Sequence, residues 1–205
     1  MKLIFATNNQ HKIDEIISAL EGSDVEIITL EQAGINIDIP EPYDTLEENA
    51  SSKSRTINEL TDSDCFSEDT GLEVEVLHGE PGARSARYAG SESPDQAIRF
   101  NKNIEKLLEK MNGDPNRRAR FRTVISLIID GEEHLFQGIC NGTIIHEKRG
   151  QYGFGYDSVF VPDGAIHTFA EMSLEEKNRF SHRKKAVDKL VAYLAEKQPE
   201  QNRKI

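Results

Sequence analysis

The first polar cluster of the sequence that could carry chemistry lies between an expected strand over residues 3–6 and an expected helix over residues 13–20. Its members are Thr7, Asn8, Asn9, Gln10, His11 and Lys12. A strand-to-helix turn directs backbone N–H groups and the positive end of the helix dipole at one point, which favours an anion. The cluster therefore predicts phosphate binding, with a plain polar turn capped by asparagine as the alternative. The sequence has no glycine-rich P-loop with its lysine, which argues against a P-loop NTPase.

Two adjacent carboxylates, Glu68 and Asp69, form the second cluster, and Glu41 is a possible distant partner. We expect the pair at the end of a strand. Carboxylates in such a place can bind Mg²⁺ through oxygen atoms while water and phosphate complete the coordination shell. The alternative is a solvated acidic turn, because the chain has 36 acidic residues against 25 Lys and Arg.

Lys53 falls within the apolar stripe of a helix expected over residues 45–60. A buried lysine costs free energy unless its ammonium group reaches a charged partner. The hypothesis is therefore a phosphate or carboxylate partner for Lys53. The alternative is that the long side chain reaches the surface and leaves its charge in water.

The C-terminal third contributes the last two groups. Gly153, Phe154, Gly155, Tyr156 and Asp157 form a turn in which two aromatic rings could sandwich a purine, although a strained β-turn explains the same string. Lys177, His182 and Arg183 place three potential cations around a helix N-terminus, which suits an anion, with a charged helix junction as the alternative. Taken together, these clusters in a net-acidic chain predict a site for a purine triphosphate with Mg²⁺.

Hydrophobic spacing places the clusters on an α/β framework. Apolar runs at residues 3–6 and 25–30, with helical spacing between them, predict strand, helix and strand. Asp130-Gly131 separates two further runs, residues 121–129 and 133–140, and predicts a β-hairpin. A βαβ-like opening followed by an antiparallel middle third predicts a mixed sheet.

Turn and cap residues set the remaining boundaries. Alternating apolar residues at 72, 74 and 76 predict a half-buried strand, Ser93-Pro94 predicts a helix with proline at its first position, and Asn141-Gly142 predicts a turn. Residues 173–176 form a capping box, and Ser181 is expected to cap the last helix. We expect one domain over residues 1–196 and a flexible tail over 197–205.

Composition bounds the classes of function. The formal net charge is -11 and hydrophobic residues make up 37% of the 205 residues, which supports a folded core and argues against a nucleic-acid partner. No apolar run approaches the roughly 18–20 residues that cross a bilayer, so we expect no membrane segment. Cys65 and Cys140 are far apart in sequence and are expected to be reduced thiols in a cytoplasmic protein.

The ordered set of motifs closely resembles the inosine/xanthosine triphosphate pyrophosphatase family. The matching strings are ATNNQHK at residues 6–12, TLEENA at 45–50 with Lys53, SEDTGL at 67–72, PGARSARYAG at 81–90, GFGYD at 153–157, AEM at 170–172 followed by EKN at 176–178, and SHR at 181–183. The resemblance implies an elongated two-lobed α/β fold with a long mixed sheet flanked by helices, a nucleotide cleft between the lobes, and a homodimer. It also implies Mg²⁺-dependent hydrolysis of ITP, dITP and XTP to the monophosphate and pyrophosphate.

The same resemblance implies roles for individual residues. The phosphate-contacting loop falls on residues 7–12, the catalytic and metal position on Asp69, and a further metal carboxylate on Glu41. The base-recognition turn falls on residues 154–157, and the remaining nucleotide contacts fall on Thr70, Lys177, His182 and Arg183. Two alternatives stay open: a house-cleaning pyrophosphatase for other modified nucleoside triphosphates, and a non-catalytic nucleotide-sensing module.

Overall fold

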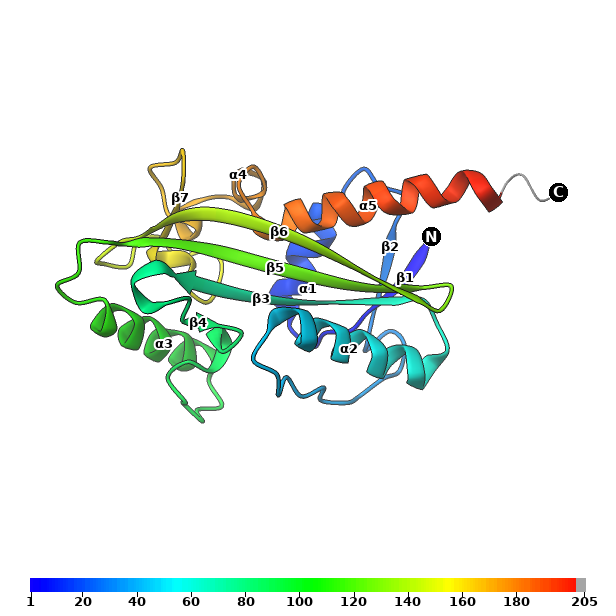
Figure 1. The fold of residues 1–205 in the computed structure, drawn as a ribbon, viewed down its shortest axis with the longest axis horizontal. Helices are drawn as coiled ribbons and strands as arrows, with labels where there is room; N and C mark the ends of the chain where they lie inside the picture. The colour runs from blue at the N-terminus through cyan, green and yellow to red at the C-terminus, as the bar shows by residue number, and fades with distance from the viewer. Residues whose placement is uncertain (202–205) are drawn as a thin grey trace.

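Three long strands run along the length of the elongated molecule in Figure 1. They are β3 (Cys65–Val74), β5 (Arg118–Ile129) and β6 (Glu132–Ile144), and each is antiparallel to its neighbour. The predicted hairpin at Asp130-Gly131 is confirmed, because Ile129 pairs with Glu132 across it. The computed structural model describes the backbone of residues 1–201 and the side chains as far as residue 197.

Shorter strands complete a seven-stranded mixed sheet with the order β2-β1-β3-β5-β6-β7. At one end, β1 (Lys2–Phe5) lies parallel to both β2 (Glu26–Thr29) and β3. At the other end, β7 (Phe160–Pro162) pairs with β6, while the two-residue β4 (Pro81–Gly82) pairs with β3 off the main path. The predicted mixed α/β sheet is therefore confirmed.

Helices cover both faces of the sheet at the end where the termini lie (Figure 1). Helix α1 (Gln10–Ala19) connects β1 to β2 and packs with α5 (His182–Gln201), whereas α2 (Leu46–Thr61) covers the opposite face. The alternation of β5 explains the layers: Ile125 and Leu127 pack on the α1 and α5 side, and Val124 packs on the α2 side.

A second lobe forms around the other end of the long strands. It contains α3 (Gln96–Lys110), α4 (Leu174–Asn178) and the short turns Glu75–Leu77, Ser85–Arg87, Asp157–Val159 and Phe169–Glu171. Its core includes Leu107 from α3 and a group of rings from Phe121, Phe160 and Phe169. Since both lobes pack on the same long strands, they hold the residues between them in a fixed relation.

The expected strand end at Glu68-Asp69 is wrong. Strand β3 runs without a break from Cys65 to Val74, so both carboxylates lie in its middle. Polar side chains are tolerated there because each finds a buried partner from another element, as Ser67 does by donating to Ala50 O at 2.5 Å. The strand also ends before Val76, which belongs to a short 3₁₀ turn.

Two other local signals are overridden by long-range packing. The predicted turn at Asn141-Gly142 is wrong, because β6 continues to Ile144 and Gly142 pairs with Pro162 of β7. A Cβ on Gly142 would lie 2.5 Å from the Phe160 ring, so glycine serves close approach here. Helix α3 begins at Gln96 after the Asp95 cap, and Pro94 therefore precedes the helix instead of opening it.

The C-terminal segment follows its predicted caps. The capping box of Ser173 and Glu176 opens α4, and Ser181 Oγ accepts a hydrogen bond from Lys184 N at the start of α5. Helix α5 continues to Gln201, past residue 197 where the tail was expected, and residues 202–205 lie outside the described part. Within residues 1–201, no helix combines the length and apolar character needed to cross a membrane.

Both cysteines are buried free thiols, as predicted. Burial raises the pKa of Cys65 and of Cys140 to about 12, so neither forms a reactive thiolate at neutral pH.

Candidate active site

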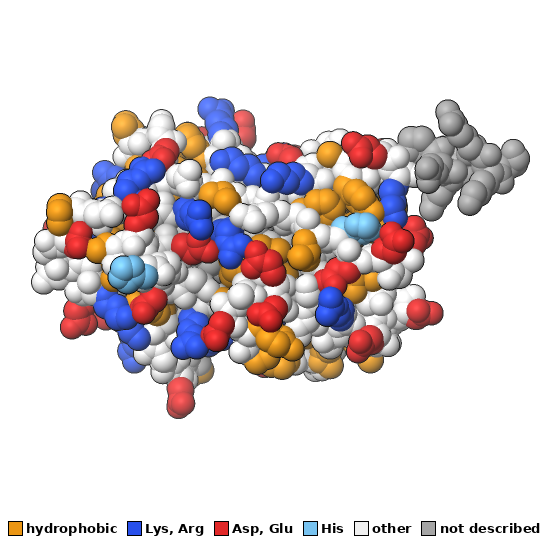
Figure 2. All heavy atoms as spheres, viewed as in Figure 1, with side chains coloured by type: hydrophobic (Ala, Val, Ile, Leu, Met, Phe, Trp, Pro, Cys, Tyr) orange, Lys and Arg blue, Asp and Glu red, His pale blue; other side chains and the backbone are white. Residues whose placement is uncertain are grey.

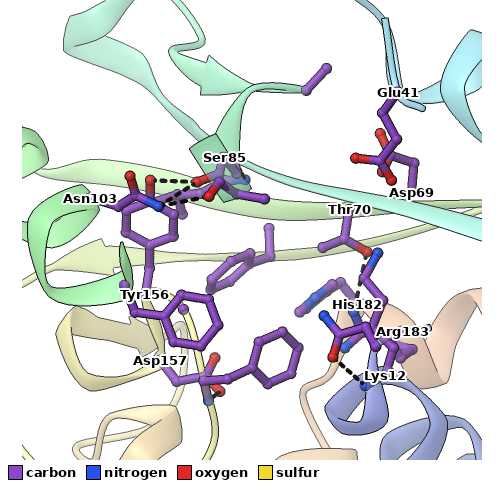
Figure 3. A pocket seen from close by; sticks show the side chains of 18 of the residues that line it. Lys12, Glu41, Asp69, Thr70, Ser85, Asn103, Tyr156, Asp157, His182 and Arg183 are labelled. Atoms are coloured by element: carbon purple, nitrogen blue, oxygen red, sulfur yellow. Dashed lines mark hydrogen bonds between the residues drawn. The ribbon is translucent and has the colours of Figure 1, made fainter. Parts of the chain in front are cut away.

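One cavity between the two lobes gathers most of the predicted site residues. It has a volume of about 730 Å³, counting the space at its open mouth. Its wall includes Asn9, Lys12, Glu41, Asp69, Thr70, Phe154, Gly155, Tyr156, Asp157, Lys177, His182 and Arg183. Figure 3 shows Glu41 and Asp69 next to each other on one side, with Ser85, Asn103 and Tyr156 on the other.

An adjoining groove collects the rest of the first polar cluster. Thr7, Asn8, Gln10 and His11 line it together with Lys12, Glu41 and Lys53. The Asn9 side chain caps α1 by accepting from Lys12 N, as the sequence predicts for an asparagine at this turn. Because Lys12 and Glu41 border both spaces, the groove is continuous with the acidic end of the cavity.

Strand alternation sends Glu68 and Asp69 to opposite faces of the sheet. Glu68 points toward α1 and α5, where its carboxylate pairs with Lys12 at 3.0 Å and Arg183 at 3.2 Å. The Thr70 hydroxyl donates to its other oxygen at 2.7 Å. Although burial opposes ionisation, Arg183 and Lys12 hold the pKa of Glu68 far below its ordinary value. Glu68 is therefore charged at neutral pH and anchors these cations.

Asp69 points toward α2 and has a different environment. Its carboxylate accepts hydrogen bonds from Asn49 Nδ2 at 3.3 Å and from Lys53 Nζ at 3.2 Å. Burial raises the pKa of Asp69 to about 6, even though Lys53 and Lys12 pull it down, and the nearby Glu41 carboxylate adds to the rise. A carboxylate with a pKa near neutrality can accept a proton from water and release it again.

Lys53 is buried and ion-paired, so the alternative that it reaches the surface is wrong. Its ammonium group lies between Glu41 and Asp69 and donates to both. Asn49 and Lys53 are four residues apart on α2 and therefore share the helix face that meets Asp69. Helix α2 begins at Leu46, where the Thr45 side chain caps it by accepting from Glu48 N.

Lys177 of α4 and Arg183 at the start of α5 are neutralised by the protein's own carboxylates. Lys177 Nζ donates to Glu15 at 2.7 Å and to Asp157 at 2.6 Å, while Arg183 pairs with Glu15 and Glu68. Arg183 and Lys177 lower the pKa of Glu15 to about 2 against the effect of its burial. Sequence reasoning missed Glu15, whose only signal is a charge at position 15 among the apolar residues of α1.

The turn at residues 154–157, predicted to recognise the base, presents its aromatic residues to the cavity. Phe154 and Tyr156 both line the wall, and the Tyr156 hydroxyl donates to Ser85 O at 3.0 Å. The Asp157 carboxylate accepts from Phe154 N at 2.9 Å, which closes the turn on itself. The predicted pairing of aromatic rings with a carboxylate is thus assembled on one side of the cavity.

His182 lines the cavity as a neutral imidazole, which corrects its prediction as a cation. Burial and the adjacent Arg183 charge lower the pKa of His182 well below its ordinary value. Among the described side chains, its Nδ1 is the only buried polar atom without a hydrogen-bond partner. An unpaired buried nitrogen in a cavity wall can accept or donate one hydrogen bond to a ligand, depending on its tautomer.

Several wall residues were missed by sequence reasoning. They are Leu72, Ala83, Ser85, Ala86, Phe100, Asn103 and Phe121. Asn103 of α3 donates to Ser85 O and Ala86 O and accepts from Ala89 N, so it fixes the loop that forms this side of the cavity. The available signal was the string at 81–90 together with a polar residue, Asn103, on the buried face of an amphipathic helix.

Glu41 and Asp69 are the residues that could hold a magnesium ion at the acidic end of the cavity. Within residues 1–201, no group of three or more His, Cys, Asp or Glu side chains is arranged to hold a metal. Mg²⁺ needs fewer protein ligands, because it commonly binds one or two carboxylates and completes its shell with water and phosphate. Glu41 and Asp69 both pair with the ammonium group of Lys53, so their carboxylates lie close together. They therefore offer two oxygen donors on one side of the cavity.

Comparisons with known proteins identify the family of the chain. The model of the Ham1 family matches residues 3–193. The dITP/XTP pyrophosphatase of Flavobacterium psychrophilum is 48% identical over 193 residues, covering 94% of this chain and 98% of that relative. The enzyme of the same description from Porphyromonas gingivalis is 50% identical, covering 94% and 97% of the two chains. Among solved structures, the Staphylococcus aureus Ham1 protein superposes with a TM-score of 0.83 at 37% identity, covering 96% of this chain and all of that one. The family model matches nearly the whole chain, and the relatives and the solved structure match it over most of their length. This chain therefore belongs to the Ham1 family.

Proposed function

We propose that the chain is a nucleoside-triphosphate pyrophosphatase that hydrolyses deaminated purine nucleoside triphosphates, namely ITP, dITP and XTP, to the monophosphate and pyrophosphate with Mg²⁺. The observation that carries the proposal is the single cavity that joins the Asp69, Lys53 and Glu41 cluster to the aromatic turn at residues 154–157. One end suits a charged phosphate chain and the other suits a flat purine. The names of the relatives support the same reaction.

Asp69 is the residue that activates water. Its buried carboxylate, with a pKa of about 6, orients a water molecule and accepts its proton as the water attacks the α-phosphorus in line with the leaving pyrophosphate. Asn49 and Lys53 hold the two carboxylate oxygens of Asp69 from different directions and fix its orientation. Lys12 and the part of the groove lined by Thr7, Asn8 and Gln10 receive the phosphate chain.

Glu41 and Asp69 would hold the magnesium ion. When bound, this ion offsets the negative charge that grows on the departing phosphates and lowers the pKa of nearby water. Glu68, also predicted as a metal ligand, takes no part in this proposal, because it points to the opposite face of β3 from Asp69, toward Lys12 and Arg183. Its role is to position Lys12 and Arg183.

Selection of the base follows from hydrogen bonding at purine position 6. Hypoxanthine and xanthine carry a keto oxygen there, which accepts a hydrogen bond, whereas the amino group of adenine donates one. A wall that offers a donor leaves two donors facing each other when adenine binds, which costs free energy. His182, with its unpaired Nδ1, is the candidate for this contact. The homodimer and the cytoplasmic location implied by the resemblance remain predictions.

Pyrophosphate release across a panel of substrates tests the proposal. The purified protein is given dITP, XTP, dATP, dGTP, dUTP or dTTP, each with Mg²⁺ and with EDTA. We expect release from dITP and XTP that EDTA abolishes. Release mainly from dUTP or dTTP would favour a pyrophosphatase for other modified nucleotides, and tight binding of dITP without release would favour a nucleotide sensor.

A further inference from the structure

The His11 ring lies against the base-recognition turn, although His11 also lines the phosphate groove together with its sequence neighbours. His11 occupies the first turn of α1, and its imidazole stacks on Phe154 with ring centres 5.0 Å apart and planes 11° from parallel. Flat stacking of this kind fixes both the position and the tilt of a ring. The contact therefore connects the start of α1 to the turn that is proposed to hold the purine.

Phe154 forms a partition between two spaces. It lines the central cavity, and it also lines a second pocket on the outside of the turn, whose wall includes His11, Tyr152 and Lys177. His11 is exposed to solvent and stacks on Phe154 while lining this outer pocket. A support of this kind can hold the ring in place without occupying the space that a purine needs.

The backbone around Phe154 gives its ring little support. Gly153 and Gly155 flank it with φ angles of +71° and +60°, a conformation that glycine adopts without strain. The Asp157 carboxylate accepts from the Phe154 N–H, and the cations of Lys177 and Arg183 lie 5.5 and 5.7 Å from the centre of the ring. Of its two aromatic neighbours, His11 stacks flat, whereas Phe100 is tilted by 41° at 6.2 Å.

We propose that His11 is a positioning residue for the purine, acting through Phe154, and not a ligand of the phosphates. This inference rests on the proposed function, because it assigns Phe154 to the base. The first turn of α1 then serves both ends of the substrate: Lys12 faces the acidic end of the cavity, and the adjacent His11 holds the aromatic wall. A preformed wall lowers the loss of conformational entropy that accompanies binding.

The test compares His11→Ala and His11→Phe with the wild-type protein, using dITP and inorganic tripolyphosphate. Tripolyphosphate has the three phosphates without a base, so its competitive inhibition constant reports on the phosphate end alone. For His11→Ala we expect the KM for dITP to rise by about two- to tenfold, since a stacked aromatic pair contributes in that range. The kcat and the inhibition constant of tripolyphosphate should stay unchanged, and His11→Phe should restore the KM. Ile17→Ala, an exposed position on the same helix, is the control for a general effect on α1.

Two results would overturn the inference. One is a dITP KM that His11→Ala leaves unchanged. The other is a weaker tripolyphosphate inhibition that His11→Phe does not rescue, which would identify His11 as a phosphate ligand. Dissociation constants for dITP, measured by calorimetry, make the same comparison without turnover. His11→Ala could weaken dITP binding in calorimetry while the wild-type protein releases no pyrophosphate. That result would refute the proposed function and leave this inference standing.

Discussion

Asp69→Asn should abolish turnover and at the same time make the folded protein more stable at neutral pH. The carboxylate is the proposed proton acceptor, so its loss should reduce kcat by about 10²- to 10⁴-fold or more. The same carboxylate is 4% exposed and carries its charge at a cost, which is why burial raises its pKa to about 6 from an ordinary 3.8. The neutral amide keeps the shape of the side chain and removes that cost.

The magnitude follows from the two pKa values. A carboxyl group with a higher pKa in the folded state binds its proton more tightly there, so its contribution to stability is lost as the pH rises through about 6. A gap of about 2 pH units corresponds to about 3 kcal/mol of unfolding free energy. About 2 kcal/mol of this falls between about pH 4.5 and pH 7.5. The stability advantage of the Asn variant should grow by that amount over this interval.

Urea unfolding of both proteins at several pH values, with EDTA present, measures this difference. Glu68→Gln is the matched control, because Glu68 is adjacent in sequence and its pKa is shifted in the opposite direction. It should lower stability at neutral pH by about 3–5 kcal/mol, since it leaves the buried Arg183 and Lys12 without a partner. A stability difference between Asp69→Asn and wild type that stays constant with pH would refute the reasoning about Asp69.

Two further predictions address the site and the fold. Lys53→Met should weaken dITP binding and move the acid limb of the kcat/KM profile upward by about 1–3 pH units, because it removes the cation that favours the ionised form of Asp69. An unchanged KM with a higher melting temperature would instead mean that Lys53 only costs stability. Gly142→Ala should destabilise the fold by about 1–3 kcal/mol in urea unfolding, because a new Cβ would meet the Phe160 ring. An unfolding midpoint equal to that of wild type would show that β7 can move aside.

Local patterns in the sequence predicted most of the framework correctly. The βαβ opening, the Asp130-Gly131 hairpin and the capping box at Ser173 depend on residues within a few positions of one another, and all three are present. The Asn141-Gly142 signal failed, because pairing with β7 extends the strand through a dipeptide that otherwise favours a turn. Tertiary contacts decide such cases, and local spacing contains no record of them.

The sequence predicted the cations of the site but not the carboxylate groups that pair with Lys177 and Arg183. Lysines and arginines at helix ends are visible in a sequence because a net-acidic chain places few of them there. Their partners are not visible, since Arg183 reaches Glu15 over 168 positions and Lys177 reaches it over 162. Sequence reasoning therefore assigned these cations to a phosphate, whereas carboxylates of the chain already pair with them.

Charged side chains of both signs occur on the surface and in the interior of the protein. Basic and acidic side chains are interspersed across the face shown in Figure 2. Other opposite charges pair in the interior. Arg183 is 1% exposed and Lys177 is 3% exposed, yet each has two carboxylate partners. Buried ion pairs of this kind are costly to desolvate, so they are better explained by positioning the cavity wall than by stability.

The two adjacent carboxylates of β3 show how one strand can separate structure from chemistry. Alternation sends Glu68 to a face where Arg183 and Lys12 hold its pKa far below the ordinary value. It sends Asp69 to a face where burial, aided by Glu41, raises its pKa to about 6 in spite of Lys53. Titratable groups whose environments push their pKa values apart are typical of acid–base sites. Glu68 therefore stays charged at neutral pH, and holds Lys12 and Arg183 in place. Asp69 can gain and lose a proton near neutrality, and that capacity, placed at the acidic end of a cavity with an aromatic wall, is what the proposed hydrolysis requires.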